Sequence, residues 1–262
     1  LRDILPENNE GLNLVPQIIV NGKDELDFLS AKIRELGYSR IDINLGCPFP
    51  LQTKKGRGAA LLSDPQKVQE LMEAIKDNDD IHYSVKMRLG MSSAEEFYPL
   101  IDIINHAPLH HVALHPRVAT QQYKGNVDML SFERISGEIT HPLIYNGDIT
   151  NLDEINSIDC RYATLSAIMI GRGLLSDPCL AYEYVNNVQL SDKEKIAKIL
   201  ELHAHLLEYY SVRLQGDSQL LVKMKTFWEY LEPLVGRKSA KLIKKSINMA
   251  KYDAAVASIS CN

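Results

Sequence analysis

Short apolar runs rich in β-branched residues alternate with amphipathic stretches over residues 14–186, and this alternation restricts the folds open to the chain. The apolar residues of Asp24–Leu36 recur at three- and four-residue steps and predict a helix. Asp64 followed by Pro65 predicts the start of another helix, with the aspartate as its N-cap. The predicted strands are Leu14–Val20, Arg40–Leu45, Tyr83–Leu89, His111–His115, Leu143–Asn146 and Ala167–Gly171. Repeated strand–helix units of this length are typical of an α/β protein with a parallel sheet.

Six strand–helix units are visible, whereas a TIM (β/α)₈ barrel has eight. We expect such a barrel without its first two βα units, and a natural protein with further residues before Leu1; an open doubly wound sheet is the alternative. Beyond residue 190 only helices are predicted, over Lys193–Tyr210, Ser218–Leu231 and Lys238–Lys251. The expected division is therefore a barrel domain over 1–190 and a C-terminal helical domain over 191–262.

The composition excludes several classes of protein. Of 262 residues, 45% are hydrophobic and 24% are charged, which is typical of a globular chain and not of a disordered or fibrous one. Apolar runs stay well short of the roughly 20 residues that span a bilayer, and no signal peptide is visible, so we expect no membrane partner. The cysteines are Cys47, Cys160, Cys179 and Cys261. Without a CxxC pair, they predict a reduced, cytoplasmic protein with no metal site.

Charge is distributed unevenly. The chain carries a net charge of −5, yet its last part, 191–262, holds 12 Lys and Arg against 8 Asp and Glu. This basic C-terminal part predicts a polyanionic partner, although a merely solvated face is the simpler alternative. Its basic face is expected to consist of Lys238, Lys241 and Lys245, while Leu242, Ile243 and Ile247 pack elsewhere.

Polar residues follow five of the six predicted strands, where active sites of parallel α/β proteins lie. They are Asn44 to Pro48, Lys86 to Arg88, His115 to Arg117, Asn146 to Asp148, and Gly171 to Gly173. Gly147, Gly171 and Arg172 predict a phosphate site, because glycines let backbone N–H groups approach an anion; tight turns are the alternative. Lys86 and Arg88 share one face of a strand, which favours an anionic cofactor over pairing with a local carboxylate.

Cys47 lies in a turn directly after a predicted strand. Three interpretations are open: a buried structural thiol, a nucleophile, or an acid that donates a proton. The loop that follows carries Lys54, Lys55 and Arg57. It is either a solvated loop or a surface that binds a polyanion.

Taken in order, these motifs resemble the flavin-dependent tRNA-dihydrouridine synthase family. The matching segments are Ile43–Pro48, Gly56–Leu62, Val85–Gly90, Leu114–Arg117, Tyr145–Ile149 and Ile168–Gly173. The resemblance covers roughly residues 14–186. It implies that the 1–190 domain is a catalytic TIM barrel that binds FMN and that the 191–262 domain binds tRNA.

The resemblance also implies roles for single residues. Gln17, Lys86 and His115 contact the flavin, and Asn146, Gly147, Asp148, Gly171 and Arg172 hold its phosphate end. Cys47 is the proton donor. Asn44 and Arg117 position the uracil, and Lys54, Lys55 and Arg57 contribute to substrate binding.

The implied reaction begins with reduction of FMN by NADPH. A hydride then passes from the flavin to C6 of a specific uridine in tRNA, and Cys47 protonates C5 to give 5,6-dihydrouridine. No obligate protein partner is evident. Two alternatives remain: an FMN-dependent TIM-barrel dehydrogenase of a free pyrimidine or other small molecule, and a non-catalytic RNA-binding remnant. Salt dependence separates the first from a tRNA enzyme, since RNA binding weakens steeply with salt.

Overall fold

The computed structural model describes residues 2–259, so Cys261 lies outside the described part of the chain. The chain forms two compact units: Leu1–Gly147 with Tyr162–Met169, and Asp148–Arg161 with Ile170–Asn262. The domain boundary at residue 190 stays a prediction, because compactness alone does not define a part that folds independently. None of the described helices is both long and apolar enough to cross a membrane.

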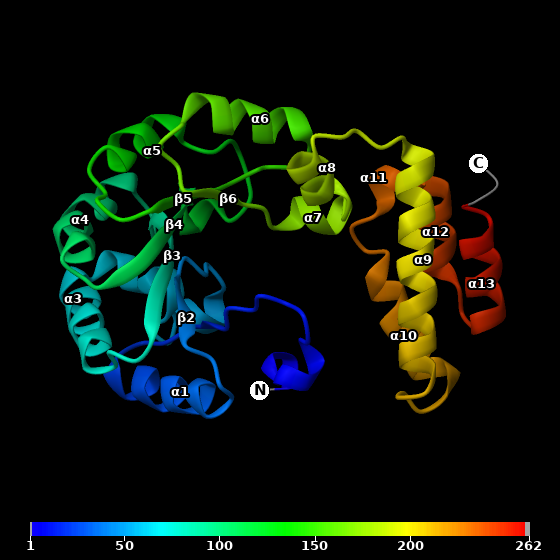
Figure 1. Cartoon of the computed structure of the whole chain (residues 1–262), viewed down its shortest axis with the longest axis horizontal. Coiled ribbons are helices and arrows are strands. Elements are labelled where there is room, and N and C mark those ends of the chain that lie inside the picture. The colour runs from blue at the N-terminus through cyan, green and yellow to red at the C-terminus, as the bar shows by residue number, and fades with distance from the viewer. Residues whose placement is uncertain (1, 260–262) are drawn as a thin grey trace. The chain divides into compact units, whose positions relative to one another are not determined.

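A parallel sheet forms the centre of the first unit, and its strands follow one another in chain order (Figure 1). The strands are β1 (Gln17–Ile18), β2 (Arg40–Leu45), β3 (His82–Gly90), β4 (Leu109–Val118), β5 (Leu143–Asn146) and β6 (Ala167–Met169). A doubly wound sheet reverses its strand order at a switch point, and no reversal occurs among the described strands. The consecutive order is that of a (β/α)₈ barrel. The predicted fold class is therefore confirmed, and the doubly wound alternative is wrong.

Four strands (β1, β3, β4 and β6) differ in length from their predictions, and two of these, β1 and β4, follow or contain a proline. β1 is shorter than expected, and the preceding Pro16 has no N–H for the ladder; its carbonyl accepts from Asp42 N at 2.9 Å. β4 is longer than expected and contains Pro116. The pairing moves from Arg88↔His115 to Gly90↔Val118, which leaves an extra residue in β4. Such a bulge accommodates a proline within a paired strand.

In Figure 1 the longer helices of the first unit lie outside the sheet: α1 (Lys23–Glu35), α3 (Pro65–Ala74), α4 (Tyr98–Asn105) and α5 (Met129–Ser136). The short helix α2 (Pro50–Thr53) follows β2. Short 3₁₀ helices cover Arg2–Ile4, Pro6–Asn8, Gly58–Ser63, Ile75–Asp77, Ala94–Phe97 and Ala119–Gln121. The predicted cap of α3 is confirmed, since the Asp64 side chain accepts from Lys67 N at 3.3 Å.

The core of the first unit lies between the sheet and these helices. Ile41, Ile43 and Leu45 of β2 are fully buried, and Tyr83 Oη of β3 donates to Ser30 Oγ of α1 at 2.7 Å. Because successive side chains of a strand point to opposite faces, the alternate residues of these strands form the other face of the sheet. That second face is polar and carries the candidate site.

The second unit is helical. It contains α6 (Leu152–Arg161), α7 (Arg172–Ser176), α8 (Leu180–Asn186), α9 (Asp192–Ser211), α10 (Gly216–Phe227), α11 (Glu232–Val235), α12 (Arg237–Lys245) and α13 (Met249–Ala257). Ser191 and Glu194 form a capping box at the start of α9, close to the predicted helix start. Ile199, Met224 and Tyr252 belong to its buried core.

The helix predicted over Lys238–Lys251 is wrong as a single element, because α12 ends at Lys245 and α13 begins at Met249. Ser246 is extended, and Asn248 caps α13 by accepting from Lys251 N at 3.0 Å. Serine and asparagine side chains compete with helical backbone hydrogen bonds in this way. The apolar positions are also only partly as predicted. Ile243 is 1% exposed, but Leu242 and Ile247 are 47% and 74% exposed.

Candidate functional site

The polar face of the first unit's sheet brings together residues from β1 to β5. The register pairs Gln17 with Asp42 and Asp42 with Ser84 at one level. The next level pairs Asn44 with Lys86, and Arg88 pairs with His115 beyond it. Alternation along β5 then places Asn146 on the same face, and Arg117 Nη1 lies 3.3 Å from His115 Nε2. Of the predicted residues, the sheet thus collects Gln17, Asn44, Lys86, His115, Arg117 and Asn146.

Lys86 is a half-buried cation with no hydrogen bond or ion pair to any residue among 2–259. Burial, and then the like charge of Arg88, lower the pKa of Lys86 to about 8, while Asp42 and Cys47 act in the opposite direction. A desolvated cation without a counter-charge is costly. An anionic or strongly electronegative ligand would compensate for it.

A hydrogen-bonded network lies beside Lys86. Gln17 Nε2 donates to Asp42 Oδ2 at 2.6 Å, and Asn44 Nδ2 donates to Gln17 Oε1 at 2.8 Å. Ser84 Oγ donates to Asp42 Oδ1 at 2.7 Å. Asp42 and Ser84 were not among the site residues predicted from the sequence. The signal for Asp42 was its spacing of two residues from Asn44 in a predicted strand, which places both on one face.

The turn that carries Cys47 is held through the backbone. Ala59 N donates to the Cys47 carbonyl at 3.0 Å, and Gly46 N donates to Asn44 Oδ1 at 3.0 Å. Gly58 has a φ of +61°, and a Cβ there would lie 2.8 Å from the Cys47 oxygen and 2.9 Å from its Cβ. Only glycine therefore fits this position. The Cys47 thiol itself is free and half-buried.

Two buried arginines shape the loop after β4. Arg88 Nη1 donates to the carbonyls of Val118 at 3.0 Å and Gln122 at 2.7 Å, and burial lowers its pKa. Arg117 is 1% exposed and donates to the Gly125 carbonyl and, at 3.3 Å, to His115 Nε2. Because a guanidinium only donates, His115 Nε2 is the acceptor in that contact. The uracil-positioning role of Arg117 stays a prediction.

The residues predicted to hold a phosphate fall in both units. In the first, Asn146 Nδ2 donates to the Met169 carbonyl at 2.8 Å, and a Cβ on Gly147 would lie 2.9 Å from Val127 Cγ1. In the second, Arg172 Nη2 lies 3.9 Å from Asp148 Oδ1, and Gly171 is exposed. Their shared role at a phosphate stays a prediction.

Two basic surfaces were predicted. In the loop after Cys47, Lys54 and Lys55 are exposed, whereas Arg57 is ion-paired with Glu25 of α1, a contact that lowers the pKa of Glu25. In the second unit α12 carries a wider basic face than predicted. Its members, all exposed and without an ion pair among residues 2–259, are Arg237, Lys238, Lys241, Lys244 and Lys245.

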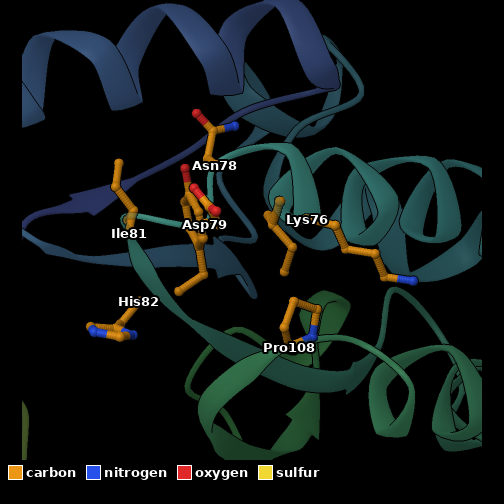
Figure 2. A pocket seen from close by; sticks show the side chains of 8 residues that line it. Lys76, Asn78, Asp79, Ile81, His82 and Pro108 are labelled. Atoms are coloured by element: carbon orange, nitrogen blue, oxygen red, sulfur yellow. The ribbon is translucent and has the colours of Figure 1, made fainter.

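A pocket of about 300 Å³ lies elsewhere in the first unit (Figure 2). Its lining comes from the segment between α3 and β3 and from Pro108 before β4, as Figure 2 shows, and includes Lys76, Asn78, Asp79 and His82. His82 is the first residue of β3, so the pocket lies at the strand end opposite Arg88. It contains none of the predicted site residues, and ligands of parallel α/β sheets bind at the carboxyl ends of the strands.

Comparisons with known proteins give a consistent result. The sequence model of the dihydrouridine synthase family matches residues 2–256. The chain is 28% identical over 207 residues to the tRNA-dihydrouridine(16) synthase of Shigella flexneri, covering 77% of this chain and 64% of the relative. It is 27% identical over 221 residues to tRNA-dihydrouridine synthase B of Proteus vulgaris, covering 82% and 68% respectively. The chain thus spans about two thirds of the length of these relatives.

Solved structures show weaker likenesses. Histamine dehydrogenase from Rhizobium sp. 4-9 has a TM-score of 0.45 at 16% identity, with coverage of 63% of this chain and 28% of that one. Morphinone reductase has a TM-score of 0.42 at 12% identity, with coverage of 60% and 46% respectively.

Proposed function

Because the chain belongs to the dihydrouridine synthase family, we propose that it is a cytoplasmic tRNA-dihydrouridine synthase that uses FMN and NADPH to reduce a specific uridine of tRNA. The observation that carries the proposal is Lys86, which has no ion pair among residues 2–259, on a polar face whose neighbouring turn presents the Cys47 thiol. In this proposal residues 1–190 supply the catalytic domain and residues 191–262 the tRNA-binding domain.

The residues of the polar face suit a flavin. Lys86 has no hydrogen bond or ion pair among residues 2–259, and Gly147 has no Cβ to fill the space beside Val127. We assign Gln17, Lys86 and His115 to the flavin ring. Its phosphate end is assigned to Asn146, Gly147, Asp148, Gly171 and Arg172. When bound, FMN supplies the hydride that C6 of uracil accepts.

Cys47 performs the proton transfer. Its thiol gives a proton to C5 of uracil, forming the C5–H bond of dihydrouracil, and the thiolate regains a proton from solvent. The Gly58 and Ala59 backbone holds the turn in place, which would keep the Cys47 backbone positioned for this transfer. Asn44 and Arg117 position the uracil ring.

The basic surfaces bind the polyanionic part of tRNA. Lys54 and Lys55 are exposed in the loop after Cys47 and contact phosphates near the reacting uridine. Arg57 belongs to the same substrate-binding loop, and its ion pair with Glu25 fixes that loop to α1. Extracting a uridine from folded tRNA costs a few kcal/mol, which phosphate contacts at these lysines and along α12 offset.

The decisive experiment maps dihydrouridine by position in tRNA from cells that lack the gene. Complementation with the wild-type gene restores dihydrouridine at one position, and Cys47→Ala does not. Cys179→Ala, which changes a buried thiol of the second unit, is the matched control and restores it. Unchanged dihydrouridine in a deletion strain without a second synthase contradicts the proposal, and full restoration by Cys47→Ala removes the assigned acid.

A further inference from the structure

Asp42 is a buried carboxylate that joins three strands of the sheet. Its residue is 6% exposed, and its two oxygens accept from Gln17 on β1 and from Ser84 on β3. A buried carboxylate is retained only where hydrogen bonds compensate for its desolvation. The two hydrogen bonds described here measure 2.6 and 2.7 Å.

The hydrogen bonds from Asp42 to the Cys47 turn all run in one direction. Gly46 N donates to Asn44 Oδ1, Asn44 Nδ2 donates to Gln17 Oε1, and Gln17 Nε2 donates to Asp42 Oδ2. A backbone N–H can only donate, and an ionised carboxylate can only accept. Both ends of the series are therefore fixed. Reversing the two amides would place Asn44 Nδ2 against the N–H of Gly46, leaving two donors facing each other.

This direction determines what the site offers to a ligand. Each amide uses one N–H in the series, and the second N–H of Gln17 and of Asn44 has no partner among residues 2–259. Asn44 pairs with Lys86 across the strands. The face thus presents two amide donors next to an ammonium group, which suits the acceptor oxygens of a flavin or uracil ring.

We propose that Asp42 is a positioning residue that orients Gln17 and Asn44 as donors and, through Asn44, holds the turn that carries Cys47. The part of this inference that concerns ligand binding rests on the proposed function. The part that concerns the Cys47 turn does not. In this proposal Asp42 acts through Gln17, whose Nε2 donates to Asp42 Oδ2.

Substitutions distinguish three effects: the direction of the hydrogen bonds, the charge of Asp42 and the packing of the buried side chains. Asp42→Asn removes the charge but keeps the direction, because its Oδ1 accepts from Gln17 while its Nδ2 donates to the Ser84 hydroxyl. Asp42→Ala removes the acceptor. Ser84→Ala is the matched control, since it removes the other bond of Asp42 at a residue that is 2% exposed and leaves Gln17 untouched. Gln17 is exposed, so Gln17→Ala interrupts the series without opening the core.

The experiment uses the 262-residue chain. The first readout is the rate at which iodoacetamide alkylates Cys47, followed by peptide mass spectrometry without flavin. The second is FMN affinity, from quenching of FMN fluorescence. We expect Asp42→Ala and Gln17→Ala each to speed alkylation and to weaken FMN binding about tenfold, as loss of an ordered hydrogen bond allows. Asp42→Asn and Ser84→Ala stay within about twofold of wild type.

A double variant then tests whether Asp42 and Gln17 act through the same hydrogen bond. If Asp42 acts through Gln17, the double variant Asp42→Ala/Gln17→Ala behaves like Gln17→Ala alone. Additive effects overturn the proposal, as does an Asp42→Ala variant that matches Ser84→Ala. An Asp42→Asn variant as impaired as Asp42→Ala assigns the effect to charge and also overturns it. Failure of the wild-type chain to bind FMN contradicts the proposed function, and the alkylation rates still decide the role of Asp42.

Discussion

The ammonium group of Lys86 lies on the polar face with no ion pair among residues 2–259, and its pKa is lowered to about 8 chiefly by burial. This charge destabilises the folded state, because no ion pair among these residues offsets the free-energy cost of its desolvation. Asp42, whose charge attracts the Lys86 ammonium, forms its hydrogen bonds to Gln17 and Ser84 instead. Lys86 therefore lowers the stability of the fold while favouring the binding of an anionic ligand.

Lys86→Met is expected to raise the free energy of unfolding at pH 7 by about 1 kcal/mol while abolishing FMN binding. The folded pKa of Lys86 is about 8 and the reference value is 10.5. Between these pH values the unfolded wild-type chain binds more protons, so wild-type stability rises with pH and the advantage of the variant shrinks. Urea unfolding at pH 7 and pH 9.5 measures this. Lys193→Met, at an exposed lysine, is the control, and a pH-independent advantage of Lys86→Met would contradict the assignment.

Residues at strand ends could be located from the sequence, but their partners could not. Lys86 and Arg88 were placed on one face because strand alternation is local. Asp42 gains its role only through Gln17, a contact that spans 25 positions. In the same way, the sequence alone predicts Arg57 to be one of several cations of a basic loop, whereas in the fold it forms an ion pair with Glu25 of α1. Contacts between side chains far apart in the sequence depend on how helices and strands pack. A local sequence pattern carries no information about that packing.

At the scale of elements, some strands match their predicted bounds and others do not. β2 and β5 match their predicted bounds, while the ends of β1 and β4 depend on ladder bonds near Pro16 and Pro116. In the second unit the periodicity of Lys238–Lys251 continues across the break between α12 and α13. Asn248 interrupts the helix there because it caps the next one, and side-chain capping is invisible to hydrophobic periodicity.

The helices of the second unit are joined by a buried polar contact that the sequence analysis also missed. Trp228 Nε1 donates to Tyr252 Oη at 2.8 Å, and His203 Nε2 lies 2.7 Å from the same oxygen. Burial raises the pKa of Tyr252 to about 12 and lowers the pKa of His203. One hydroxyl thus connects α9, the end of α10 and α13.

Tyr252→Phe is expected to lower the free energy of unfolding by about 2 kcal/mol, because it leaves the Trp228 N–H and the His203 nitrogen buried without this partner. Thermal and urea unfolding at pH 7 measure the loss. Tyr209→Phe is the matched control, since that tyrosine is 42% exposed, and it should change stability by less than about 0.5 kcal/mol. Equal effects of the two substitutions would show that the hydroxyl of Tyr252 contributes nothing specific.

At the scale of the whole molecule, charge is divided along the chain more sharply than the net value of −5 suggests. The basic face of α12 belongs to the second unit, while the polar face that carries Lys86 belongs to the first. In the proposed function the basic face binds tRNA phosphates and the polar face binds the flavin and the uracil. Phosphate contacts supply affinity without recognising a base, so the two roles can be tested separately. Substitutions on α12 should therefore alter tRNA binding and leave FMN binding intact.

Replacing Lys241 and Lys244 of α12 together by glutamine tests this separation. Each lysine that neutralises a phosphate adds about one unit to the slope of log affinity against log salt. The double variant is expected to weaken tRNA binding about tenfold or more at 150 mM salt and to lower the slope by about two, with unchanged FMN affinity. Lys193→Gln, at an exposed lysine of α9, leaves both unchanged. A wild-type reaction rate that is insensitive to salt would instead favour a small-molecule substrate, because a free pyrimidine releases no condensed counterions on binding.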